Sequence, residues 1–244
     1  MPPLRREDAL FSWFEKLHGP VWGSVLDSGT GEHSLGWLES LRPASLTAVT
    51  VEAWRMPGLG AIAPAAKVIL GQWTDPLLLA GQTFDVVLSD YVIGAIDGHA
   101  PYFQYGYLER IRPHVADRLY LVGLEPPPRD GSVLDEVCRL RDAAILLAGH
   151  RCYREYPREV VLRWVESTGF EVMDSASFPN RLGERFVNGQ LDVAVRKLPL
   201  FKDRAVAAAF GAHIEALRER ALAAVPQVWG ADWVIAARRP RADG

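Results

Sequence analysis

The feature of this sequence that most constrains its fold is the alternation of short apolar, β-branched runs with longer segments of helical periodicity. Such alternation is typical of α/β proteins, in which helices connect the parallel strands of one sheet. The strands that we expect are residues 22–27, 46–52, 67–73, 84–90, 118–125, 170–178 and 232–240. The pattern therefore predicts an α/β fold with a seven-stranded, doubly wound and mostly parallel sheet.

Helical segments are expected between these strands, at residues 7–18, 34–41, 105–115, 132–148, 157–168 and 203–225. Residues 53–66 are rich in proline and glycine, so a helix there should be short and broken. Residues 187–198 fit a helix or a strand, and we favour the helix because the final strand then pairs with 170–178 across a helical insertion.

The 244 residues are expected to form a single domain. Residues 1–125 would be its ligand-binding half, and 126–169 would add a helical insertion and a further helix. Residues 186–225 would be a helical cap inserted between the last two strands.

The composition is that of an ordinary globular protein, with 49% hydrophobic and 23% charged residues. A net charge of −3 gives no support for nucleic-acid binding, which usually shows a basic excess. The N-terminus lacks the apolar segment of a signal peptide, and the longest apolar run, "AAILLAG", is too short to span a membrane. With only two cysteines, Cys138 and Cys152, we expect a reduced, cytoplasmic protein that binds no membrane.

The stretch "VLDSGTG" (25–31) is the clearest candidate for a ligand-binding loop, because glycine lets a ligand approach the backbone closely. A phosphate-binding loop would continue with lysine and then serine or threonine, but Glu32 and His33 follow here. A dinucleotide-binding loop would have a third glycine where Ser34 stands, and Asp27 would repel a pyrophosphate. A ligand with an amine and a ribose, but no phosphate, fits better.

"VLDSGTG" resembles the first motif of class I (Rossmann-like) S-adenosylmethionine-dependent methyltransferases, and four later motifs follow in the order of that family. Glu52 ends the second strand, "GQW" follows the third, and "FDVVLSDYVIGAID" and "GYLERIRPHVADRLYLVGLEP" resemble the fourth and fifth. The resemblance implies S-adenosyl-L-methionine as cofactor, with Glu52 on its ribose hydroxyls. The residues that it implies for the cofactor site are Asp27, Ser28, Gly29, Gly31, Glu52, Ala53, Gln72, Trp73 and Asp90.

Two positions depart from the family pattern. Gln72 replaces the usual acid after the third strand, so that its amide oxygen, or Asp75, would meet the adenine amino group. His33 takes the place of a frequent third glycine and narrows the loop. Purely structural explanations also exist: Asp27 as a turn cap, Glu52 as a solvated strand end, Trp73 as a core residue, and the glycines as turn residues.

Two segments rich in tyrosine and histidine are the candidates for an acceptor pocket: "DYVIGAIDGHAPYFQYGYL" (90–108) and "AGHRCYREYP" (148–157). We take His99 and His150 as candidate general bases. Tyr91, Tyr102, Tyr153 and Arg185 are the candidate substrate-binding residues, Arg185 for a substrate carboxylate. Packing tyrosines and surface histidines are the alternative. No His, Cys or acidic residues have the spacing of a metal site.

The sequence thus predicts a methyltransferase acting on nitrogen or oxygen of a small organic molecule, as a monomer or homodimer. The alternatives are methylation of protein or tRNA, a nicotinamide-dependent oxidoreductase, and a partner-binding module that keeps the fold without catalysis. Ser34 and Asp27 disfavour the oxidoreductase, and the absence of a basic face disfavours RNA.

Overall fold

The strands of the structure form one open sheet. A computed structural model describes residues 8–240, and its sheet has seven strands in the order β3-β2-β1-β4-β5-β7-β6. The strands are β1 Ser24–Asp27, β2 Ser45–Thr50, β3 Lys67–Leu70, β4 Phe84–Asp90, β5 Val115–Leu124, β6 Glu171–Leu182 and β7 Gln227–Arg238. All neighbours are parallel except β7, which is antiparallel to both β5 and β6. The predicted α/β fold with a seven-stranded, mostly parallel sheet is confirmed.

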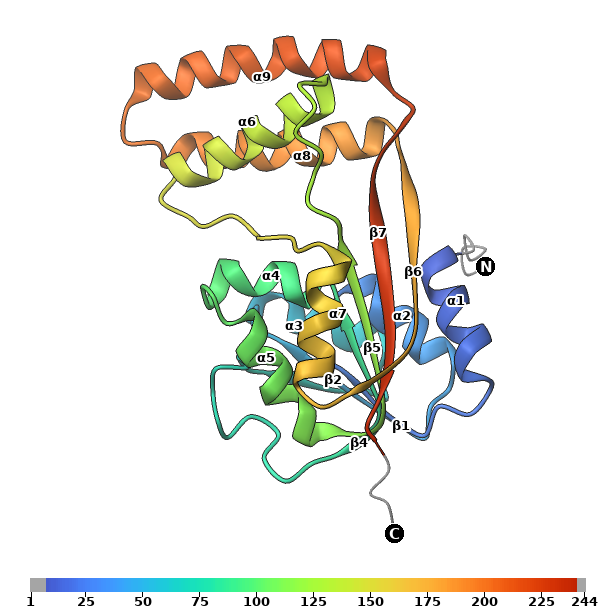
Figure 1. Ribbon diagram of the computed structural model, residues 1–244. Helices are drawn as coiled ribbons and strands as arrows, with labels where there is room; N and C mark the ends of the chain where they lie inside the picture. The colour runs from blue at the N-terminus through green and yellow to red at the C-terminus, as the bar shows by residue number, and fades with distance from the viewer. Residues whose placement is uncertain (1–7, 241–244) are drawn as a thin grey trace.

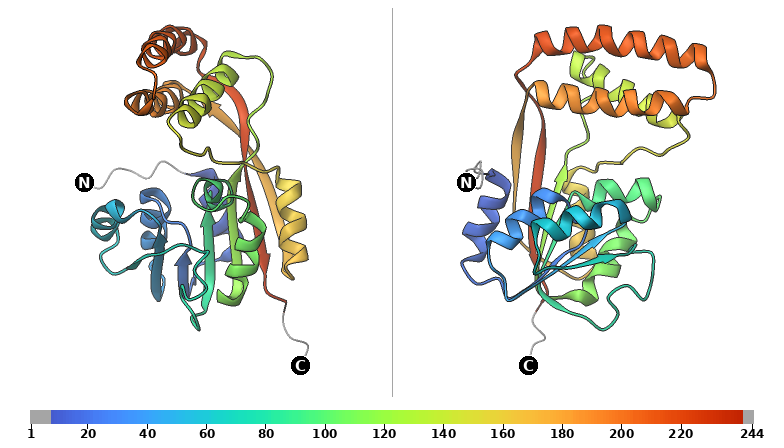
Figure 2. Two further views of the ribbon diagram at one scale, coloured as in Figure 1. Left: turned by 90° about the vertical axis from the view of Figure 1, so that its left-hand side faces the viewer. Right: turned by 180° about the vertical axis from the view of Figure 1, so that it is seen from behind.

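Helices cover both faces of the sheet (Figures 1 and 2). The described helices are α1 Ala9–His18, α2 Glu32–Ser40, α3 Met56–Ile62, α4 Val92–His99, α5 Gln104–Ile111, α6 Val133–Leu147, α7 Arg158–Ser167, α8 Glu184–Lys197 and α9 Arg204–Ala224. Buried side chains of α1, α2 and α3 form one apolar cluster with the sheet, and those of α4, α5 and α7 form another on the opposite face. Residues 187–198 are helical, as expected, because Val187, Leu191 and Ala194 form a buried stripe.

A third apolar cluster lies beyond the sheet, where α6, α8 and α9 pack together around Leu140, Leu191 and Leu217 (Figure 1). We call these three helices the cap. The antiparallel β6 and β7 carry two of them, because their pairing continues from Glu171 opposite Arg238 to Leu182 opposite Gln227, where α8 follows β6 and α9 precedes β7 (Figure 2). The cap lies beyond the end of the sheet at which β4 leads into α4, the carboxyl end of the parallel strands (Figure 1).

Two local expectations need correction. The segment after the fourth strand, where no helix was expected before residue 105, contains α4, and Asp90 is the last residue of β4. The second strand ends at Thr50 rather than Glu52, so Glu52 lies on the following turn before a short 3-10 helix at Ala53–Arg55.

Candidate active site

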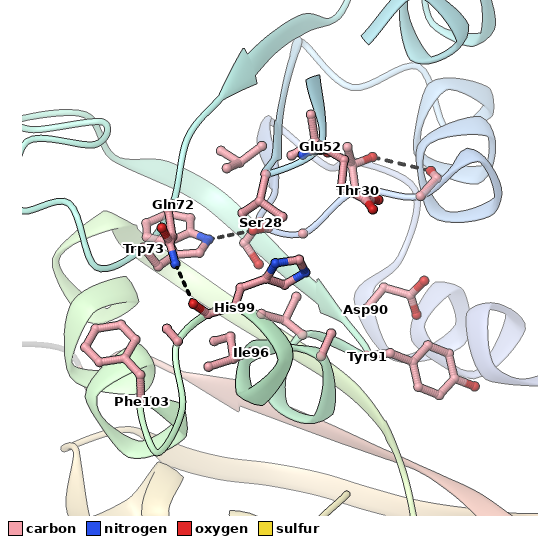
Figure 3. A pocket seen from close by; sticks show the side chains of 18 of the residues that line it. Ser28, Thr30, Glu52, Gln72, Trp73, Asp90, Tyr91, Ile96, His99 and Phe103 are labelled. Atoms are coloured by element: carbon pink, nitrogen blue, oxygen red, sulfur yellow. Dashed lines mark hydrogen bonds between the residues drawn. The ribbon is translucent and has the colours of Figure 1, made fainter. Parts of the chain in front are cut away.

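A cavity of about 390 Å³ lies at the carboxyl ends of β1, β2 and β4, which is where ligands bind in open α/β sheets. We call it the donor cavity (Figure 3). Seven of the nine predicted cofactor residues line it: Ser28, Gly29, Gly31, Glu52, Gln72, Trp73 and Asp90. Asp27 and Ala53 do not; Asp27 is fully buried beneath the loop, and Ala53 is exposed.

The glycine-containing loop is held between β2 and β4 by hydrogen bonds. The Ser28 hydroxyl donates to the Leu88 carbonyl at 2.8 Å and lies 2.6 Å from the Tyr107 hydroxyl. The Trp73 indole N–H donates to the Ser28 carbonyl at 2.6 Å, and the Thr30 N–H donates to the Val49 carbonyl at 2.9 Å. Trp73 is therefore both a buried core residue and a wall of the donor cavity, and the loop backbone is fixed before any ligand binds.

Asp27 joins the end of β1 to the start of α2. The Ser34 hydroxyl donates to its carboxylate at 2.8 Å and accepts from the Gly31 N–H at 3.1 Å. Complete burial raises the pKa of Asp27 to about 6, against the lowering effect of its hydrogen bonds. Ser34, where a dinucleotide-binding loop has glycine, thus orders the turn through Asp27.

The two loop glycines are required for different reasons. A Cβ at Gly29 would lie 2.3 Å from the Cγ2 of Val92, the first residue of α4, so glycine here permits close packing of the loop on that helix. A Cβ at Gly31 would meet nothing within 4 Å, and Gly31 lines the donor cavity. Gly31 is therefore the position where the absence of a side chain leaves space open to a ligand.

Polar side chains from three strand ends face this space (Figure 3). Glu52 is partly exposed and forms an ion pair with Arg55. The Gln72 amide nitrogen donates to the His99 carbonyl at 3.1 Å, which ties the end of β3 to the end of α4. A carboxylate beyond β2 and an amide beyond β3 are groups that can accept hydrogen bonds from hydroxyl and amino groups.

Asp90 and Tyr91 form the junction between β4 and α4. Burial, followed by the nearby charges of Asp27, Asp8 and Asp232, raises the pKa of Asp90 to about 8. Tyr91 caps α4 in the left-handed region, with φ 53°. Such strained conformations of residues other than glycine concentrate at functional sites.

The buried Asp90 carboxyl predicts a pH-dependent change in stability. Its pKa is higher in the folded protein than in the unfolded chain, so the folded state holds a proton that the unfolded chain has lost between about pH 4 and pH 8. The contribution of Asp90 to the free energy of unfolding thus falls as the pH rises through this range. We expect Asp90→Asn to stabilise the protein by about 1–3 kcal/mol at pH 8.5 and by much less near pH 4. Urea unfolding at both pH values measures this, and equal stabilities at pH 8.5 would contradict it.

A larger cavity of about 1170 Å³ adjoins the donor cavity and extends between the sheet and the cap. Tyr91, His99 and Tyr153 line both cavities, and residues of α6 and α8 line the larger one. The two predicted acceptor segments meet here: the Arg154 N–H donates to the Gly94 carbonyl at 3.0 Å, and the Arg151 guanidinium donates to Asp97 at 3.4 Å. We call the larger space the acceptor cavity.

The remaining predicted site residues divide into two groups. The His99 imidazole points into the donor cavity (Figure 3), whereas His150 lines only the acceptor cavity and accepts from the Lys197 ammonium at 2.8 Å. Tyr102 and Arg185 line neither cavity: Tyr102 is exposed beneath the Arg151 and Arg154 guanidiniums, and Arg185 is exposed in the first turn of α8.

Sequence reasoning did not single out two residues that line the acceptor cavity, Asp232 and Glu155. Asp232 begins what reads as an ordinary final strand, and Glu155 lies among five other polar or aromatic residues of its segment. Within residues 8–240 no three His, Cys, Asp or Glu side chains cluster as metal ligands, and no helix has the length and apolar character needed to cross a bilayer.

Known proteins resemble this chain in structure but not detectably in sequence. No protein family and no curated protein matches the sequence. A protein from Bacillus halodurans assigned as a candidate methyltransferase superimposes with a TM-score of 0.65 at 15% identity, over 95% of this chain and 99% of that one. Magnesium protoporphyrin IX methyltransferase from Synechocystis, solved with S-adenosylhomocysteine, superimposes with a TM-score of 0.53 at 12% identity, over 96% and 81%.

The chain has the class I methyltransferase fold. The same fold also occurs in the [4+2]-cyclase SpnF, which superimposes with a TM-score of 0.56 at 13% identity, over 96% of this chain and 81% of that one. At such identities the likeness establishes the class I fold, whereas the reaction must be inferred from the residues of the site.

Proposed function

We propose that this protein transfers a methyl group from S-adenosylmethionine to nitrogen or oxygen of a small organic molecule. The observation that carries the proposal is the junction of the two cavities: a cavity over a preformed glycine loop opens, past Tyr91, His99 and Tyr153, into a larger one. Two cavities with a common wall suit a reaction in which a group passes between two bound molecules.

The donor cavity fits S-adenosylmethionine in its chemistry. Gly31 leaves space beside the loop backbone, and Glu52 would accept hydrogen bonds from the ribose hydroxyls once Arg55 moves aside. Gln72 would meet the adenine, and Asp90 would lie near the positively charged methionine end. When bound, the donor supplies a methyl group on a sulfonium, which is already activated for displacement. The chain's own residues then orient the acceptor and accept its proton.

His99 is the histidine that we assign to proton acceptance, since it lines both cavities. Residues of the cap line part of the acceptor cavity, and the net charge is −3, so a small molecule suits it better than a protein or tRNA. The neighbour from Synechocystis, a magnesium protoporphyrin IX methyltransferase solved with the demethylated donor, supports the same assignment.

The ribose assignment predicts the effect of removing Glu52. Glu52→Ala should weaken S-adenosylhomocysteine binding by about 1.5–3 kcal/mol, the usual range for a hydrogen bond to a charged group. Arg55→Ala is the matched control, because it removes the ion-pair partner and leaves the carboxylate free. We expect that control to bind within about threefold of the unmodified protein. Calorimetric titration measures both, and unchanged affinity in Glu52→Ala would remove the ribose assignment.

A further inference from the structure

Three carboxyl groups lie near the junction of the two cavities: Asp90 and Asp232 beside Tyr91, and Glu155 against Gly94 of α4. Asp90 precedes Tyr91 in the chain, Asp232 interacts with the Tyr91 hydroxyl, and the charge of Asp232 acts on Glu155. The side-chain partners of Asp232 are Tyr91 and Asn180, both neutral, and Oδ1 of Asp90 is inaccessible to solvent and has no hydrogen-bond partner. Among residues 8–240 none of the three forms an ion pair, and burial disfavours the ionised form of each.

Most cationic side chains around the acceptor cavity have other partners, and among them the Arg141 guanidinium also acts on Glu155 through its charge. The pairs are Arg129 with Asp135, Arg141 with Asp142, Arg151 and Arg154 with Asp97, and Lys197 with the His150 imidazole. Buried carboxylates are usually paired, since an isolated one loses hydration without replacement. The three carboxyl groups therefore lie where a bound cation would favour their ionised form.

Their titration agrees with this geometry. Burial raises the pKa of Asp90 to about 8 and that of Glu155 to about 7, and it raises the pKa of Asp232 as well. The positive charges of the proposed donor would meet Asp90, which lines the donor cavity. Glu155 and Asp232 line the acceptor cavity and not the donor cavity, so the donor's charge would not pair with them and a second cation would have to bind in the acceptor cavity.

We propose that the acceptor is a primary or secondary amine, whose cationic nitrogen binds between Glu155 and Asp232 with the Tyr91 and Tyr153 rings beside it. Aromatic rings next to a carboxylate pair stabilise an ammonium through both cation–π and charge interactions. This inference rests on the proposed function and specifies its substrate class. It selects nitrogen over oxygen as the methylated atom.

The reaction balances with groups already assigned. The bound ammonium gives one proton to the His99 imidazole, and the freed nitrogen lone pair attacks the methyl carbon of the donor. The C–N bond forms as the C–S bond breaks, and the sulfur keeps the bonding electron pair, which leaves S-adenosylhomocysteine. The product is a methylated ammonium, which the same two carboxylates hold until release.

Calorimetric titration of the protein saturated with S-adenosylhomocysteine tests this proposal. The probes are benzylamine and tyramine, with benzyl alcohol and 4-(2-hydroxyethyl)phenol as neutral counterparts of nearly the same shape. We expect each amine to bind at least about tenfold more tightly than its alcohol, and Glu155→Gln and Asp232→Asn each to weaken amine binding about tenfold. Glu136→Gln is the matched control, because Arg220 pairs with that carboxylate outside the acceptor cavity, and it should bind amines within about twofold.

The outcomes separate this inference from the function on which it rests. A melting temperature at or above that of the unmodified protein shows that Glu155→Gln and Asp232→Asn are folded. Three results would each overturn the amine proposal. The first is that the alcohols bind as well as the amines, and the second is that amine affinity is unchanged in both variants. The third is that no amine binds at 10 mM, roughly the weakest affinity worth assigning to a site. If S-adenosylhomocysteine does not bind, the proposed function is overturned instead. If amines still bind without S-adenosylhomocysteine, and Glu155→Gln weakens that binding, the cation site is supported independently of the methyltransferase function.

Discussion

Replacing His99 by alanine is expected to slow methyl transfer by about 10²–10⁴-fold, the usual contribution of a general base. Donor affinity should change by less than about threefold, because the Gln72 amide bonds to the backbone carbonyl of residue 99, which the substitution keeps. Single-turnover kinetics with a methylated amine as product measures the loss. Calorimetry with S-adenosylhomocysteine measures the donor affinity.

His150→Ala is the matched control for this experiment. His150 lines the acceptor cavity but not the donor cavity, and Lys197 donates to its Nδ1. We expect less than about a tenfold loss there, from acceptor binding alone. If His150→Ala loses more turnover than His99→Ala, the base has been assigned to the wrong histidine. If neither variant is slower, positioning alone carries catalysis.

Gly31→Val should abolish measurable donor binding, a loss of more than about 100-fold, while leaving the melting temperature within a few degrees. The reason is that a Cβ at Gly31 meets no protein atom within 4 Å. The valine side chain would therefore occupy space that only the ligand would otherwise fill. Scanning calorimetry and titration of the same preparation separate stability from affinity. Normal donor binding by this variant would show that the ligand does not approach the loop.

Gly29→Ala provides the contrast, because its Cβ would meet the Val92 side chain rather than open space. We expect it to cost about 1–3 kcal/mol of stability through overpacking. Adding Val92→Ala removes the clashing methyl group and should restore much of that loss. Equal stability of the single and double variants would contradict this packing role.

The sequence predicted the part of the fold that depends on regular patterns. β-Branched runs identified each strand of the sheet, and the apolar stripe at Val187, Leu191 and Ala194 identified α8. Helix α4 was missed because its sequence, "VIGAIDGH", contains two glycines and β-branched residues and has no capping side chain. Burial of Val92, Ile93 and Ile96 against the sheet stabilises it instead, which is a tertiary effect that local propensity does not contain.

The donor loop was likewise predictable in position but not in detail. The sequence placed Gly29 and Gly31 in one role, and only the structure distinguishes packing on Val92 from space left for a ligand. Glu155 and Asp232 come from segments 77 residues apart, and their approach depends on how β7 returns beside β5. The spacing of Glu155 and Asp232 in the sequence does not indicate that they lie in one cavity. The acidic groups of the acceptor cavity could therefore not be inferred before the fold was known.

The central claim is that the donor cavity binds S-adenosylmethionine, and one calorimetric experiment tests it most directly. The purified protein is titrated with S-adenosylhomocysteine and, in parallel, with NAD. We predict micromolar binding of S-adenosylhomocysteine, about −8 kcal/mol, and no detectable heat from NAD. Binding of NAD without S-adenosylhomocysteine would assign the cavity to a dinucleotide, and binding of neither would contradict a donor site at Gly31 and Glu52.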